Sequence, residues 1–122
     1  MRNTLSILLL LLSFSCVSQE EKGIYIIDVQ SVKTDIIGKD VQLVDVRSEE
    51  EYNKGHIDDA ININIADKER FTAEIQKLDK TKPVYIYCHS GVRSHRASKL
   101  IQELGFTTIY DFTGGWSVWS QN

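Results

Sequence analysis

Short apolar runs alternate with amphipathic stretches throughout the sequence after Gly23. This alternation limits the possible folds more than any other feature, because strand, helix and strand in succession build a parallel sheet covered by helices. We expect the strands at residues 24–27, 42–46, 60–65, 84–87 and 106–112. A chain of 122 residues has room for one domain. The pattern therefore predicts an α/β domain over residues 24–120, with a parallel five-stranded sheet and helices on both faces.

Residues that begin and end helices stand between these runs. Gly38 follows an amphipathic stretch at residues 31–37, and Ser48 precedes three glutamates as an N-cap precedes an acidic first turn. The run at 84–87 does not alternate, which predicts a strand buried on both faces. Apolar residues recur at helical spacing in two later stretches: Phe71, Ile75 and Leu78, and then Ala97, Leu100, Ile101 and Leu104 before Gly105.

The beginning of the chain has a different character. Arg2 precedes an almost unbroken apolar run at residues 5–12, which is too short to span a bilayer but suits the core of a secretory signal. Residues 1–15 resemble a bacterial lipoprotein signal, and cleavage there would make Cys16 a lipid-modified N-terminus. Cleavage after Ser18 would instead remove residues 1–18 and release a soluble protein. An uncleaved anchor is the third outcome.

Residues 16–23 follow as an acidic stretch that we expect to form a solvated tether. The predicted location is outside the cytoplasm, in the bacterial periplasm or at a membrane through a lipid anchor. Exported proteins usually pair their cysteines, yet processing would leave Cys88 alone or with an acylated Cys16. A free thiol in an exported protein calls for a reason. The formal net charge of −3 argues against nucleic acid as a partner.

Cys88 ends the run at 84–87, and Gly91 lies in the short loop before the next helix. Ligands of open parallel sheets bind at the carboxyl ends of the strands, so the thiol should lie there, above the helix N-terminus. Unpaired backbone N–H groups at such a terminus stabilise a thiolate and lower its pKa. Gly91 permits the positive φ that turns these groups inward. The basic residues nearby should attract anions: His89, Arg93, His95, Arg96 and Lys99.

The alternative interpretation of Cys88 is a buried and inert cysteine at a strand end, followed by a turn glycine and a solvated basic helix. The two interpretations differ in what they require of the sulfur. A reactive thiol has to be reachable from solvent and has to titrate below an ordinary cysteine.

The sequence resembles the rhodanese-like sulfurtransferases in three segments that follow the order of that family. They are LVDVRSEEEYNKGHIDDAININ at residues 43–64, CHSGVRS at 88–94 and GGWSVW at 114–119. The resemblance covers essentially all of residues 24–120. The family usually has glycine where Asp59 stands, so the shape of that turn is expected to differ slightly.

The resemblance implies a catalytic role for Cys88, which in that family takes a sulfane sulfur from a donor and holds it as a persulfide. It also implies that a cradle of backbone amides surrounds the sulfur, formed by His89, Ser90, Gly91, Val92 and Arg93. Thiosulfate or a persulfide would be the small anionic donor, and a thiol or a protein would be the acceptor. The chemistry proceeds by nucleophilic catalysis in two half-reactions and needs neither a metal nor an organic cofactor.

Two alternatives remain open. A lipid-tethered persulfide carrier would use the same residues to pass sulfur to a partner with little turnover of thiosulfate. Phosphatases and arsenate reductases of related fold also resemble this chain, but the phosphatases place five residues between cysteine and arginine. Here four residues separate Cys88 from Arg93. The shorter loop leaves room for one sulfur and crowds a phosphoryl group, which favours sulfur transfer.

Other polar and aromatic residues have a structural interpretation. Asp45 and Arg47 stand at a predicted strand end, where a charge pair that joins the strand to a neighbouring helix is favoured over ligand binding. His56 is expected to make a hydrogen bond within its loop. Trp116 and Trp119 are expected to pack the closing segment of the chain.

Overall fold

The computed structural model describes residues 22–122. The predicted signal at residues 1–15, the alternative cleavage site after Ser18 and the lipidation candidate Cys16 lie outside the described residues. Within residues 22–122, no helix combines the length and the apolar character that a membrane crossing requires.

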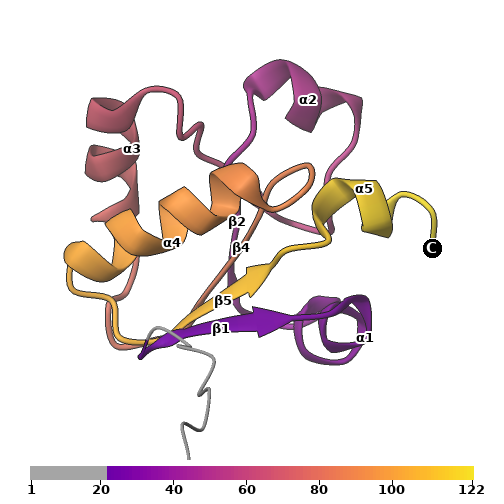
Figure 1. Cartoon of the computed structure of the whole chain (residues 1–122), viewed down its shortest axis with the longest axis horizontal. Coiled ribbons are helices and arrows are strands. Elements are labelled where there is room, and N and C mark those ends of the chain that lie inside the picture. Colours follow the sequence, from indigo (N-terminus) through magenta and orange to yellow (C-terminus); the bar gives the residue numbers. More distant parts are fainter. Residues whose placement is uncertain (1–21) are drawn as a thin grey trace, which may run out of the picture.

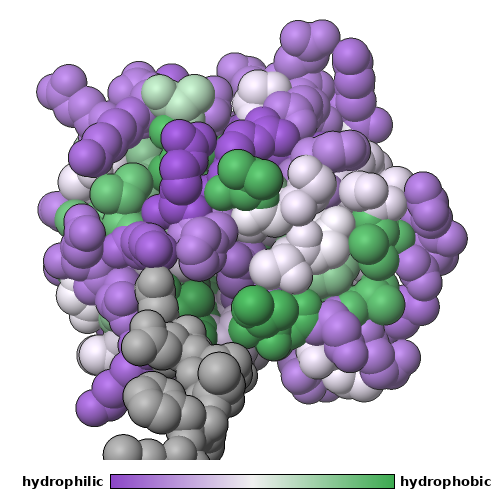
Figure 2. Space-filling model, in the orientation of Figure 1, coloured by the Kyte–Doolittle hydropathy of each residue, from purple (hydrophilic) through white to green (hydrophobic). Residues whose placement is uncertain are grey.

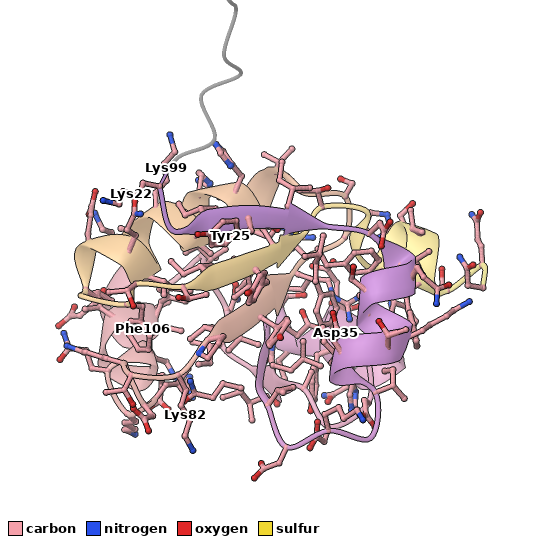
Figure 3. The ribbon with its side chains drawn as sticks, turned by 90° about the horizontal axis from the view of Figure 1, so that it is seen from below. Lys22, Tyr25, Asp35, Lys82, Lys99 and Phe106 are labelled. Carbon is pink, nitrogen blue, oxygen red and sulfur yellow. The ribbon has the colours of Figure 1, made fainter. Side chains whose placement is uncertain are left out.

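Five parallel strands form one sheet in the order β1-β5-β4-β2-β3. Their bounds are β1 Ile24–Ile27, β2 Gln42–Asp45, β3 Ile61–Asn62, β4 Val84–Tyr87 and β5 Ile109–Phe112. Figure 3 shows β1, β5 and β4 lying next to one another. The prediction of a parallel five-stranded sheet is confirmed, and β4 is its central strand.

Six helical segments connect and follow the strands. They are α1 Val29–Ser31, the π-helical segment η1 Val32–Ile36, α2 Glu49–Lys54, α3 Lys68–Ile75, α4 Val92–Glu103 and α5 Gly115–Trp119. Figure 1 shows α3 beside α4, and α1 at the far end of β1 from them. The predicted helix at residues 31–37 is present, but it begins at Val29 and continues as a π-helical turn before Gly38.

The helices cover both faces of the sheet, as predicted. One core lies under α3 and α4 and contains Phe71, Ile75, Ala97 and Ile101 together with strand residues. The other core lies under α1, η1, α2 and α5. It buries Val32, Ile36, Leu43, Ile57, Ala60, Tyr87 and Phe112, against which Tyr52, Trp116 and Trp119 pack. Because β4 lies between both cores, Tyr87 and Ile86 are both fully buried.

Two strands are shorter than the apolar runs predict. The run at 60–65 forms a ladder with β2 only at Ile61 and Asn62. The residues after Asn62 bind β2 only through single hydrogen bonds; for example, the Ile63 N–H donates to the Asp45 carbonyl at 2.9 Å. The run at 106–112 begins with Phe106, which packs into the core under α4, so the strand starts at Ile109. Some apolar residues of each run are thus buried in the core without belonging to a strand.

Two predicted helix ends, the start of α2 and the end of α4, are confirmed by their caps. Ser48 forms a capping box with Glu51, in which the Glu51 N–H donates to the Ser48 hydroxyl at 3.2 Å. Gly105 has a φ of 101° and follows the C-cap of α4. These caps fix where α2 begins and where α4 ends.

Candidate active site

Cys88 lies where the sequence predicts it, directly after β4 and before the loop that enters α4. It points to the same side as Ile86, two residues earlier in the chain, and joins the core under α4. In the sheet order, β4 stands between β2 and β5, so the chain leaves this strand at the centre of the carboxyl edge. Ligands of open α/β sheets bind at such a position.

A backbone N–H group and a hydroxyl group lie beside the Cys88 sulfur. The Gly91 N–H donates to Sγ at 3.1 Å, and the Ser94 Oγ lies 3.6 Å from Sγ. Burial raises the pKa of the Cys88 thiol, but hydrogen bonds from the Ser94 hydroxyl and from the backbone amides of Ser94, Gly91 and Ser90 outweigh it. The net pKa is lowered. One of the two requirements for a reactive thiol is therefore met.

The backbone of the loop is held from outside by the chain after β5. Gly91 has a φ of 99°, as predicted, and a Cβ there would lie 2.8 Å from the Thr113 carbonyl oxygen. The first N–H groups of α5 bind the outer side of the loop: Trp116 donates to the Cys88 carbonyl at 2.9 Å and Ser117 to the His89 carbonyl at 3.0 Å. With these carbonyls turned outward, the amide groups of the loop turn toward the sulfur.

The second requirement, access from solvent, is not met in this conformation. Cys88 is 1% exposed. The loop above it is itself exposed at His89 and Ser90, and Val92 at the start of α4 is 72% exposed. The sulfur thus lies one layer below the surface, and a donor has to pass the side chains of the loop to reach it.

Arg93 is bound to a partner that the sequence interpretation did not assign. Its two terminal nitrogens donate to the two carboxylate oxygens of Glu51 at 2.7 and 2.9 Å. The hydrogen bonds from Arg93 lower the pKa of Glu51 to about 2. The pair joins the start of α4 to α2 across 42 residues of sequence. The Arg93 guanidinium is therefore bound to Glu51, whereas the sequence interpretation expected it to attract an anionic donor.

Asp45 and Arg47 form the structural charge pair that the sequence predicts. Arg47 and Asp45 are 2% and 0% exposed, and the Arg47 Nη2 lies 2.6 Å from Asp45 Oδ2. The same nitrogen donates to the Gly55 carbonyl at 2.7 Å, which ties the end of β2 to the end of α2. The Arg47 guanidinium also lies 5.1 Å from the centre of the Trp116 ring.

A sequence profile of the rhodanese-like domain matches residues 28–122. The chain belongs to the rhodanese-like domain family. It is 36% identical over 83 residues to the thiosulfate sulfurtransferase GlpE of Shewanella oneidensis, an alignment that covers 68% of this chain and 79% of the relative.

Solved structures agree with this membership. A rhodanese-like domain protein from Staphylococcus aureus superposes with a TM-score of 0.68 at 28% identity, over 78% of this chain and 90% of that one. The human single-domain sulfurtransferase TSTD1 shares the fold with a TM-score of 0.65 at 21% identity, over 80% of this chain and 96% of that one.

The remaining structural predictions for this rhodanese-like domain concern His56, the two tryptophans and Asp59. His56 lies 3.1 Å from the Tyr52 carbonyl through Nδ1 and stacks on the Tyr52 ring, so this loop residue bonds to the preceding helix α2 and not within its own loop. Trp116 and Trp119 pack against the core under α5, as predicted. In the turn that contains Asp59, the residue with a positive φ is Asp58, at 46°. Asp59 therefore stands at a position that does not require glycine.

Besides Glu51, the sequence interpretation missed two residues near the candidate site. Ser94 is fully buried beside the thiol, and its position three residues after Gly91 on a helix was the available signal. Asp111 is fully buried on β5. The signal for Asp111 was a lone acidic residue inside an apolar run, on the same strand face as Ile109. Among residues 22–122, no group of three or more His, Cys, Asp or Glu residues could hold a metal ion.

Proposed function

We propose that this rhodanese-like domain transfers a sulfane sulfur from thiosulfate or a persulfide donor to a thiol or protein acceptor, with Cys88 as the nucleophile. The observation that carries the proposal is the thiol itself. It stands at the start of α4 within reach of the Gly91 amide and the Ser94 hydroxyl, and its pKa is lowered despite burial. The names of relatives such as GlpE support the same class of reaction.

The first half-reaction forms one bond and breaks one. The Cys88 thiolate attacks the outer sulfur of thiosulfate, a new S–S bond forms, and sulfite leaves with the electron pair of the old S–S bond. The products are a Cys88 persulfide anion and sulfite, so charge and atoms balance without a cofactor. The loop amides that bind the thiolate would then bind the outer sulfur of the persulfide.

The second half-reaction returns the enzyme to its starting state. An acceptor thiolate attacks the outer sulfur, which leaves with the acceptor as a persulfide, and Cys88 becomes a thiolate again. The two half-reactions share one stored intermediate, which gives ping-pong kinetics. Arg93 would contribute positive charge near the sulfur while it remains bound to Glu51.

The intact mass of the full chain tests the covalent step. We expect incubation of the Cys16→Ser variant with thiosulfate to add the mass of one sulfur atom, and the further change Cys88→Ser to abolish the gain. Ser90→Ala is the matched control, because it alters an exposed loop side chain and leaves the backbone amides in place. A failure to gain mass with thiosulfate and with a low-molecular-weight persulfide would refute the proposal.

The alternative role as a persulfide carrier uses the same first step and differs in the second. Repeated turnover of thiosulfate with cyanide or a small thiol as acceptor identifies an enzyme. A single loading that is discharged only to a particular protein identifies a carrier. Comparison of steady-state rates with the amount of persulfide formed in one loading separates the two.

We also propose that the domain is exported and held at a membrane by lipid attached to Cys16. The support is the sequence pattern of residues 1–16 alone. Incorporation of radiolabelled fatty acid in a bacterial host, lost in Cys16→Ala, is the expected result. Release of an unlabelled protein that begins at Gln19 would show soluble export instead.

A further inference from the structure

Asp111 is a buried acidic residue that the proposed reaction does not use. Its side chain is fully buried, and neither carboxyl oxygen has a hydrogen-bond partner at ordinary distance and angle among the described residues. Burial raises the pKa of Asp111, and the nearby Ser94 hydroxyl and His95 offset part of this effect. A buried carboxylate without hydrogen bonds is unfavourable, so the group is expected to hold a proton.

The sheet register places Asp111 on the strand next to β4 and on the same face of the sheet as the thiol. Asp111 pairs with Ile86 of β4 and with Ile26 of β1, and both of these neighbours are aliphatic. Cys88 lies two residues beyond Ile86 on the same face, which is about 7 Å along the strand. Asp111 and Cys88 therefore stand one strand apart under the first turns of α4.

Ser94 lies between these two groups. Its Oγ is 3.6 Å from the Cys88 sulfur, and its hydroxyl acts on the Asp111 carboxyl. The Ser94 hydroxyl also donates to the Gly91 carbonyl at 3.2 Å in this conformation. A hydroxyl has one hydrogen to donate and two lone pairs to accept. Three acceptors thus compete for one hydrogen: the sulfur, the Gly91 carbonyl and, when ionised, Asp111.

We propose that Asp111 is a positioning residue, which as a neutral carboxylic acid donates a hydrogen bond to Ser94 and so turns the Ser94 hydroxyl toward the Cys88 sulfur. An ionised Asp111 would do the opposite in two ways. It would accept the hydrogen of Ser94, and it would place a negative charge near the thiolate. The charge states of Asp111 and Cys88 are therefore coupled.

The groups around Asp111 agree with this role. On α4 the groups that act on it are Ser94 and His95; its register partners are Ile86 on β4 and Ile26 on β1, and Cys88 follows β4 in the same core as Ile86. His95 is exposed, so its charge is screened by solvent. The Ser94 hydroxyl is accordingly the group through which Asp111 acts on the sulfur.

Infrared difference spectroscopy tests the protonation state directly. We expect the carbonyl stretching band of a protonated carboxylic acid at neutral pH in the full chain carrying Cys16→Ser, and its absence after the further change Asp111→Asn. The band should shift in Ser94→Ala, because its hydrogen-bond acceptor is removed. Absence of an Asp111 band at neutral pH would overturn the inference.

The titration of Cys88, followed by the ultraviolet absorbance of the thiolate, tests the coupling. Asp111→Ala should raise the pKa of Cys88 by about one unit, which lowers the ratio of thiolate to thiol about tenfold at a given pH. This is the loss expected for one hydrogen bond to a charged group. Asp111→Asn should preserve the low pKa, because its amide N–H donates to Ser94 in place of the acid. Asp111→Leu fills the space without a donor and should behave as Ala does.

A double-mutant cycle excludes a purely structural role. In a Ser94→Ala background, Asp111→Ala should have no further effect on the pKa of Cys88. Additive effects, or equal pKa shifts in the Asn and Ala variants, would overturn the inference. These measurements need no sulfur donor, so they remain decisive even if the proposed sulfur transfer fails. If the Ala and Leu variants do not fold, the infrared band and its shift in Ser94→Ala still decide.

Discussion

At the scale of single residues, the site combines a lowered thiol pKa with a nearly complete lack of solvent contact. Cys88 is 1% exposed, yet donors to its sulfur outweigh the effect of burial on the pKa. Thiosulfate is a narrow anion with its reactive sulfur at one end. Under the proposed function, we therefore expect a narrow donor such as thiosulfate to reach Cys88 more readily than a bulky oxidant does.

The first prediction concerns this selection by size. In the Cys16→Ser chain, a bulky aromatic disulfide should react more slowly with native Cys88 than with the same thiol in denaturant, because the loop covers the sulfur. Thiosulfate should react with the native form and not with the denatured one, which lacks the cradle. Stopped-flow absorbance and intact mass measure the two rates. Equal reactivity of native and denatured protein toward the aromatic reagent would contradict a covered thiol.

The second prediction concerns Glu51, whose pKa is lowered from 4.5 to about 2 chiefly by Arg93. A group with a lowered folded-state pKa contributes stability above its unfolded pKa and loses it as pH falls through the folded value. Wild-type stability should therefore decline between about pH 4.5 and about pH 2, and Glu51→Gln should flatten that decline. Urea midpoints at several pH values measure it. Glu50→Gln, which alters an exposed pair with Lys54 on the same helix, should leave the profile unchanged.

At the scale of elements, the active loop depends on two helices that approach it from opposite sides. The start of α4 supplies amides to the sulfur, and the start of α5 binds the carbonyls of Cys88 and His89. The short helix α5 is thus part of the site although none of its side chains was assigned a chemical role. Gly115 makes this contact feasible, because a Cβ there would meet the His89 carbonyl oxygen at 2.6 Å and would also clash with the Cys88 carbonyl oxygen.

The third prediction follows from this contact. Gly115→Ala should destabilise the fold by about 1–3 kcal/mol through overpacking and should raise the pKa of Cys88, because the loop backbone has to move. Gly38→Ala is a matched control, since Gly38 also has a positive φ of 73° but nothing lies within 4 Å of its added Cβ. It should cost about 1–2 kcal/mol from backbone strain alone and leave the thiol unchanged. Thermal unfolding and thiolate absorbance measure both effects. Equal thiol pKa values in the two variants would contradict the proposed support by α5.

At the scale of the whole molecule, charge and apolar surface are distributed unevenly. The chain has a formal net charge of −3, yet a groove of about 420 Å³ between α3 and α4 is lined by Lys68, Arg96 and Lys99. Figure 3 shows Lys99 of α4 and Asp35 of η1 far apart on the molecule.

The face in Figure 2 carries separate apolar areas among hydrophilic ones. The exposed large apolar residues include Tyr25 and Ile26 of the edge strand β1.

The fourth prediction concerns this distribution of charge. Arg96→Glu should lower the rate of Cys88 loading by thiosulfate on the order of threefold at moderate salt, as Coulomb's law gives for a dianion about 10 Å away, and the difference should shrink as salt is added. Lys33→Glu makes the same change of charge on η1, under the other face of the sheet, and should have a smaller effect. Persulfide formation followed by mass spectrometry measures both rates. An equal loss in the two variants would show that only net charge matters.

Local sequence signals determined the architecture and the place of the thiol. Apolar runs and caps near in sequence decide strands and helices, because those elements satisfy their backbone over a few residues. They put Cys88 after the central strand and predicted the positive φ of Gly91. The bounds of β3 and the start of β5 were predicted wrongly, because apolar residues are used for burial as well as for pairing.

The partners of the site residues were decided by the tertiary structure alone. Glu51 meets Arg93 across 42 residues of sequence, and α5 reaches the loop only because β5 lies beside β4. Asp111 stands under Ser94 for the same reason. Such contacts depend on strand order and register, which arise from the packing of the whole chain. The sequence pattern around either residue therefore does not predict its partner.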